Sequence, residues 1–164
     1  NKKKDNWIRR FWVKNKKTRN NWMKKILIVN ANYYRNISAN LVLSAKKKLN
    51  SQKIKTKIID VPGVFEIPTI IRKYINKFDA FLALGCVIKG ETPHFDLICR
   101  STFDSILNIS TKYNKPIGNG IITAFNLTQA KKRSSINKNS SKPNKGVEAA
   151  LAVITVLKNE PKNT

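Results

Sequence analysis

From residue 25 onward, hydrophobic residues recur in runs that suit strands. Ile26–Asn30 and Phe78–Ile88 are almost continuously apolar, which is typical of strands buried on both faces. Ile54–Val61 alternates between apolar and polar residues, as a strand with one exposed face does, and Ile117–Phe125 is a further apolar run. The pattern therefore predicts four strands.

Segments of helical period separate these strands. Ile37, Leu41 and Ala45 recur on one helical face, and Asn36 is a residue type that caps helix N-termini. Pro68 suits the first turn of the next helix. The predicted helices span residues 36–46, 66–76, 95–113, 127–134 and 145–159. Helices that alternate with strands indicate parallel βαβ units, so we expect an α/β fold, a three-layer sandwich around a four-stranded parallel sheet.

The length of 164 residues suits one domain, which we place at residues 23–164. Residues 1–22 carry nine Lys and Arg against one Asp without a sustained period, so we expect a basic, poorly ordered extension. An arm that touches RNA or an anionic membrane is the alternative interpretation. Met23 marks another candidate start of the chain, and segment 138–143 is polar enough to predict a flexible loop.

The net charge of +24 raises the question of nucleic-acid binding. The basic residues are spread along the chain and accompany many Asn and Ile, as an AT-rich coding sequence would produce. No zinc-finger spacing and no aromatic-glycine RNA-binding motif is present in the sequence. We therefore do not expect a nucleic-acid partner.

The two cysteines, Cys86 and Cys99, form no CxxC pattern, and the chain has one histidine. These counts exclude a disulfide framework and argue against a zinc site, so we expect reduced thiols in a cytoplasmic protein without a metal. No apolar stretch approaches the ~18 residues of a membrane span, so no membrane association is expected.

In an open parallel sheet, ligands bind beyond the carboxyl ends of the strands, and the richest such end is Gly85–Asp96. Gly90, Glu91 and Thr92 precede a predicted helix, where unpaired backbone N–H groups and the helix dipole favour a phosphate. His94 falls in the first turn of that helix, and histidine exchanges protons near neutral pH. A lone histidine is often structural, so this end by itself indicates only a generic anion-binding enzyme.

The other strand ends add candidates whose roles stay open. Tyr33 and Tyr34 follow the first strand, where they could stack on a flat heterocycle or cap the core. Glu66 follows a rigid Pro-Gly turn and could be a helix N-terminal charge or an acceptor for ligand hydroxyls. Arg133 lies in a Lys-Lys-Arg run, where a solvated face is the default interpretation.

Several ordered motifs together resemble the lumazine synthase family: ILIVNANYY, VPGVFEIP, LGCVIKGETPHFD, IGNGIITAFN followed by LTQAKKRS, and NKGVEAAL. The resemblance covers about Lys25 to Asn159, and GETPHFD with NKGVEAAL at this separation is highly specific. The IGNGI segment resembles the alphaproteobacterial branch. The resemblance implies a flavodoxin-like fold and an enzyme of riboflavin biosynthesis. Such an enzyme condenses 5-amino-6-(D-ribitylamino)uracil with 3,4-dihydroxy-2-butanone 4-phosphate to 6,7-dimethyl-8-ribityllumazine, without a cofactor or metal.

The resemblance also implies residue roles. Tyr33 takes the place of the aromatic residue that stacks on the pyrimidine, and His94 that of the catalytic proton shuttle. The other uracil and ribityl contacts fall on Val64, Phe65, Glu66, Val87, Ile88, Lys89 and Asn119. The resemblance implies that the butanone phosphate is bound by Gly90, Glu91, Thr92 and Arg133, and that Lys145 and Glu148 line the same site. An arginine there can hold the phosphate bidentately.

Two features depart from the family pattern. Asn119 stands where many members carry a phenylalanine contributed by the neighbouring subunit, and segment 134–144 is longer than the usual connection. The family implies a homo-oligomer, a pentamer or a multiple of one, with active sites between neighbours and association with riboflavin synthase. A riboflavin synthase of the same fold is the main alternative. A flavodoxin-like or response-regulator module is disfavoured, because segment 30–36 has neither a phosphate loop nor an acidic cluster.

Overall fold

The computed structural model of this chain describes residues 24–137 and 143–161. Their elements are β1 (Lys25–Ala31), α2 (Arg35–Asn50), β2 (Lys55–Val61), the 3-10 turn η1 (Val64–Glu66), α3 (Ile67–Lys73), β3 (Ala80–Ile88), α4 (His94–Tyr113), β4 (Ile117–Ala124), α5 (Leu127–Arg133) and α6 (Lys145–Lys158). Each predicted strand and helix is present. The predicted extension at 1–22 and most of the predicted loop at 138–143 lie outside the described residues.

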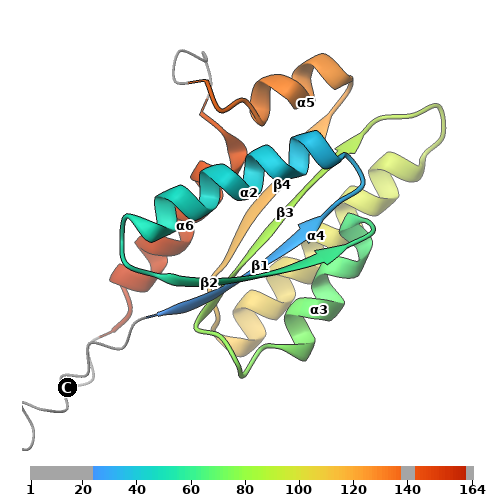
Figure 1. Cartoon of the computed structure of the whole chain (residues 1–164). Coiled ribbons are helices and arrows are strands. Elements are labelled where there is room, and N and C mark those ends of the chain that lie inside the picture. The colour runs from blue at the N-terminus through green and yellow to red at the C-terminus, as the bar shows by residue number, and fades with distance from the viewer. Residues whose placement is uncertain (1–23, 138–142, 162–164) are drawn as a thin grey trace, which may run out of the picture.

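The strands form one parallel sheet in the order β2-β1-β3-β4. Figure 1 shows α2 and α6 side by side over one face of this sheet and α3 and α4 over the other. Each face has its own cluster of buried apolar side chains. The α/β three-layer fold expected from the sequence is therefore confirmed.

Strand burial follows position in the sheet. The central strand β1 is buried from Ile26 onward, whereas the edge strand β2 alternates between exposed and half-buried residues until it ends at Val61. A central parallel strand is covered by helices on both faces, which explains the continuous apolar runs in the sequence. No helix within residues 24–137 and 143–161 is long and apolar enough to cross a membrane.

Two expectations about helix starts were wrong in detail. The backbone N–H of Ser38 donates to the carbonyl of Tyr34 at 2.9 Å, so α2 begins at Arg35 and Asn36 is not its cap. The predicted helix at 66–76 is shorter and starts at Ile67, because the Pro-Gly turn is followed by the 3-10 turn η1. Asparagine caps operate elsewhere, where Asn126 and Asn144 accept backbone N–H groups at the starts of α5 and α6.

The helix α6 packs closely on β4 because two residues of that strand lack side chains. A Cβ at Gly118 would lie 2.5 Å from the Ala149 carbonyl oxygen and 2.6 Å from Leu82 Cδ2. A Cβ at Gly120 would collide with Leu84. The two glycines of the IGNGI motif therefore set the spacing between the sheet and α6.

We expect Gly118→Ala to lower the free energy of unfolding by about 1–3 kcal/mol, as overpacking of a close-packed interior does. The measurement is guanidinium-induced unfolding. Gly90→Ala is the matched control, because no atom lies within 4 Å of its added Cβ. Equal stability of the two variants would contradict this account of the β4–α6 contact.

Candidate active site

A cavity of about 630 Å³ lies at the carboxyl ends of β1, β2 and β3, beside the start of α4. We call it the tyrosine cavity. Its volume is in the range of small-molecule sites, about 300–1,000 Å³. Seven residues expected at the site line it: Tyr33, Val64, Phe65, Glu66, Val87, Ile88 and His94. The structure thus brings together residues from three separate motifs.

Two tyrosine rings form one wall of the tyrosine cavity. The rings of Tyr33 and Tyr34 meet edge to face, with centroids 4.9 Å apart, and Tyr33 is 73% exposed. Burial raises the pKa of the Tyr34 hydroxyl, and the neighbouring Tyr33 and Cys86 raise it further. Tyr34 therefore keeps its proton at neutral pH, and Tyr33 presents a ring that a flat ligand can cover.

The turn between β2 and α3 is held by its own acidic residue. The carboxylate of Glu66 accepts the backbone N–H of Gly63 at 3.0 Å, which closes the Pro-Gly turn. Val64 is buried, and a Cβ at Gly85 would lie 3.0 Å from Val64 Cγ1, so Gly85 lets this turn approach β3. Phe65 is 60% exposed at the cavity. Both interpretations of Glu66 therefore stay open, since it caps the turn and also lines the cavity.

His94 is the first residue of α4 and lies exposed at the rim of the tyrosine cavity. Ile98, one helical turn later, lines the same cavity. The i, i+4 spacing could have identified Ile98 from the sequence, because residues four apart share a helix face.

Residues 89–93, which precede His94, do not line the tyrosine cavity. The backbone N–H of Lys89 donates to the Ala124 carbonyl at 2.9 Å, which extends the pairing of β3 with β4. Lys89 and the three residues after it are exposed. Within the described part of the chain, no acceptor pairs with the backbone N–H groups of Gly90, Glu91 and Thr92. These donors are free for an anion, as the phosphate-nest hypothesis requires.

A second cavity, of about 190 Å³, lies between α4 and the edge strand β4. We call it the arginine cavity. It is lined by Phe103, Asn119, Ile121, Ile122, Thr123, Arg133 and Lys145. Three of these residues were expected at the site. No described residue lines both the arginine and the tyrosine cavity, so one chain divides the predicted site into two parts.

One carboxylate oxygen holds both cations of the arginine cavity. Glu148 Oε2 lies 2.7 Å from Arg133 Nη2 and 3.2 Å from Lys145 Nζ, and Arg133 Nη1 donates to the Pro143 carbonyl at 2.9 Å. Burial by itself would raise the pKa of the Glu148 carboxyl. The hydrogen bonds and charges of Arg133 and Lys145 outweigh burial and hold that pKa below its ordinary value. The cluster therefore keeps one net positive charge for an anion.

Asn144 positions this cluster. Its side chain is buried, donates to the carbonyls of Ser134 and Ser135 at 2.8 and 3.2 Å, and accepts the Gly146 N–H at 2.8 Å. These bonds join the end of α5 to the start of α6. Arg133 and Lys145 consequently face the same carboxylate although they belong to different helices.

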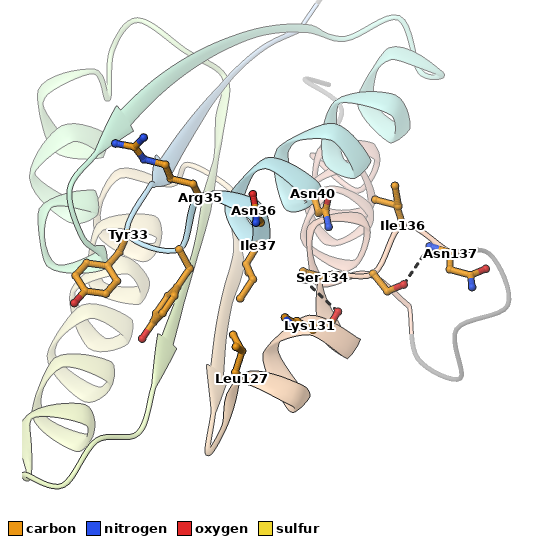
Figure 2. A pocket seen from close by; sticks show the side chains of 12 residues that line it. Tyr33, Arg35, Asn36, Ile37, Asn40, Leu127, Lys131, Ser134, Ile136 and Asn137 are labelled. Atoms are coloured by element: carbon orange, nitrogen blue, oxygen red, sulfur yellow. Dashed lines mark hydrogen bonds between the residues drawn. The ribbon is translucent and has the colours of Figure 1, made fainter.

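A larger hollow, of about 830 Å³, lies on the other side of the two tyrosines, between α2 and α5. Figure 2 shows Leu127 and Lys131 on one side of it and Asn40 on the other, while the Arg35 side chain extends away. Tyr33 is its one lining residue that was expected at the site. Among the described residues, the hollow shares Tyr33 and Tyr34 with the tyrosine cavity.

Residues 23–160 match the family model described as 6,7-dimethyl-8-ribityllumazine synthase. A protein of that name from Methylorubrum populi is 35% identical to this chain, over 81% of this chain and 80% of its own length. One from Campylobacter curvus is 38% identical, over 81% of this chain and 86% of its own length. One from Vesicomyosocius okutanii is 38% identical over 82% of this chain and 84% of its own length.

The chain belongs to the lumazine synthase family. The resemblance expected from the ordered motifs is thereby confirmed, and the alphaproteobacterial Methylorubrum among the relatives agrees with the IGNGI segment. Sequence reasoning missed Ile98 and Phe103 as cavity residues. Phe103 is nine residues beyond His94, outside every motif that identified the family.

We expect Glu148→Gln to destabilise the protein at pH 7 and to have a smaller effect at pH 3. The folded-state pKa of this carboxyl is lowered, so its contribution is present above the unfolded pKa and is lost as pH falls through the folded value. Guanidinium unfolding of both proteins at the two pH values measures the difference. Glu91→Gln, at an exposed position, is the control for the loss of a carboxylate. A stability difference independent of pH would contradict the Glu148 ion-pair account.

Proposed function

We propose that this protein is a 6,7-dimethyl-8-ribityllumazine synthase of riboflavin biosynthesis. It would condense 5-amino-6-(D-ribitylamino)uracil with 3,4-dihydroxy-2-butanone 4-phosphate and release phosphate and water. One observation carries the proposal. The family's motif residues divide between a cavity with an aromatic wall, which suits a heterocycle, and a cavity with two cations, which suits a phosphate. These are the distinguishing parts of the two substrates.

The substrate roles follow from this division. Tyr33 would cover the pyrimidine ring, the backbone of Val64 and Phe65 with the Glu66 carboxylate would hold the ribityl chain, and the main chain of residues 87–89 would bind the uracil edge. Arg133, Lys145 and the free N–H groups of residues 90–92 would bind the phosphate. Glu148 would hold Arg133 and Lys145 in place.

The reaction needs orientation, proton transfer and anion stabilisation. The amine of the uracil attacks the butanone carbonyl, and loss of water gives an imine. A proton then leaves carbon as the carbon–oxygen bond to phosphate breaks. The enol that this elimination leaves tautomerises to a new carbonyl at the former hydroxyl carbon, and the ribitylamino nitrogen closes the ring on that carbonyl with loss of water. His94, at the rim of the tyrosine cavity, is the group that can move these protons, and Arg133 stabilises the departing phosphate.

The division of the site between two cavities also supports an assembly. The arginine cavity opens at the edge strand β4 and shares no residue with the tyrosine cavity. We propose that the arginine cavity of one copy closes the tyrosine cavity of its neighbour in a ring, with a pentamer as the expected size. A cytoplasmic location and association with riboflavin synthase stay predictions.

The proposed activity is tested with the purified protein and both substrates. Fluorescent lumazine should form when both are present and should be absent when the butanone phosphate is omitted. Conversion of supplied lumazine into riboflavin, without condensation, would instead identify a riboflavin synthase of the same fold.

We expect Arg133→Ala and His94→Ala to affect different kinetic constants. Loss of the Arg133 contacts should raise KM for the butanone phosphate about 10- to 100-fold, since a hydrogen bond to a charged group contributes about 1.5–3 kcal/mol. Loss of the His94 proton shuttle should lower kcat about 100-fold. Steady-state kinetics with each substrate varied in turn measures both. Unchanged constants in both variants would refute the site assignment.

Mixing these two variants tests whether neighbours share the site. In oligomers co-expressed from equal amounts, half of the tyrosine cavities keep His94 and half of the arginine cavities keep Arg133. About a quarter of the interfaces are then intact, and a corresponding share of wild-type activity should return. Activity no higher than that of the separate variants would exclude a site built from two copies.

A further inference from the structure

Phe103 lies in the arginine cavity, although no family motif contains it. It is a half-buried residue of α4 that packs against the buried cluster under α3 and α4. It also lines the cavity that holds Asn119, Arg133 and Lys145. Among the described residues that line this cavity, Phe103 is the one with an aromatic ring.

The neighbouring position on β4 offers no ring. Asn119 lies on the strand face opposite Gly118 and Gly120, which face α6. The side-chain oxygen of Asn119 accepts the backbone N–H of Ile121 at 3.1 Å, so the amide is bonded to its own strand. Asn119 is therefore small and locally satisfied, and the aromatic surface of this cavity comes from α4.

The size and lining of the arginine cavity indicate what Phe103 can contact. A volume of about 190 Å³ is below the ~300 Å³ typical of small-molecule sites, so a ligand as large as the uracil substrate would lie partly outside it. Arg133 and Lys145 provide for an anionic group there. The ring of Phe103 provides an apolar face for a flat group beside that anion.

We propose that Phe103 packs against the uracil substrate bound in the neighbouring copy's tyrosine cavity and thereby sets the affinity for that substrate. This inference rests on the proposed function and on the site shared between copies. Phe103 is then a binding residue whose ring comes from α4, where the family's usual aromatic residue would come from β4. Tyr33 covers the heterocycle from one copy, and Phe103 contacts it from the other.

The test is Phe103→Leu, which keeps an apolar side chain and removes the ring. KM for the uracil substrate should rise about tenfold, as for the loss of one base–aromatic contact, while KM for the butanone phosphate changes less than twofold. Phe78→Leu is the matched control. Phe78 is half-buried against the same cluster and touches the rings of Tyr74 and Phe81, but lines neither cavity. Its KM values should equal those of the wild type.

A second pair of variants separates the ring from the packing. Phe103→Ala should raise the same KM, and Phe103→Ala with Asn119→Phe should restore it, because the double variant returns a ring to the cavity from β4. If Phe103→Leu does not assemble, Phe103→Tyr and Phe103→Met replace it. The tyrosine variant should keep the wild-type KM and the methionine variant should not.

The outcomes distinguish this inference from the proposed function. An inactive wild-type protein overturns both. An active wild type whose Phe103→Leu variant loses thermal stability but keeps KM for the uracil substrate overturns the inference alone, because Phe103 then only packs. A KM that rises equally for both substrates also overturns it.

Discussion

The close packing of α6 against both the sheet and the neighbouring helix α2 is the constraint on which the rest of this structure depends. Gly118 and Gly120 let α6 approach β4, and Gly146 lets its first turn approach α2, where a Cβ would collide with the Leu41 carbonyl. Because α6 begins at Lys145, this packing also places Lys145 and Glu148 at the edge of the sheet. The two IGNGI glycines and the NKG glycine are therefore packing requirements, and the charge cluster follows from them.

The few acidic residues of this chain hold defined structural positions. The chain has 33 Lys and Arg against nine Asp and Glu. Several of the acids are structural acceptors: Glu66 closes its turn, Asp60 accepts the Asn30 amide at 2.8 Å, and Asp79 accepts the Lys25 N–H at 2.7 Å. Among the described acidic residues, Glu148 is the one that pairs with two cations. A single carboxylate shared by two cations fixes their positions and leaves one net positive charge. A second carboxylate would neutralise that charge.

Much of the fold was predictable from periodicity. The central strands β1 and β3 are covered on both faces, so their runs are apolar throughout, and the stripe Ile37, Leu41, Ala45 is buried as expected. The start of α2 was not predictable. Asn36 is a residue type that caps helices, but the first helical hydrogen bond is accepted by the Tyr34 carbonyl. The path of the chain as it leaves β1 is not written in the residue type.

The candidate site residues could be named from the sequence, but their distribution between two cavities of one chain could not. Motif matching lists residues such as His94 and Arg133 as members of one pocket, because it records position along the chain. The structure places them in separate cavities of one chain. Phe103 escaped detection for a related reason: α4 and β4 bring it and Asn119, 16 residues further along the chain, to the same cavity, and no family motif contains Phe103.

The edge strand β4 connects these observations. Its outer side has no neighbouring strand in the described chain, and uncovered edges of sheets favour association. The same edge carries a cavity below the usual size of small-molecule sites, with two cations and one ring. A pocket of this kind gains a function when another surface closes it, and the tyrosine cavity has the aromatic wall and the histidine that the arginine cavity lacks. Each chain thus carries both parts, one at the strand ends and one at the strand edge, and the proposed ring of copies would use every one of them.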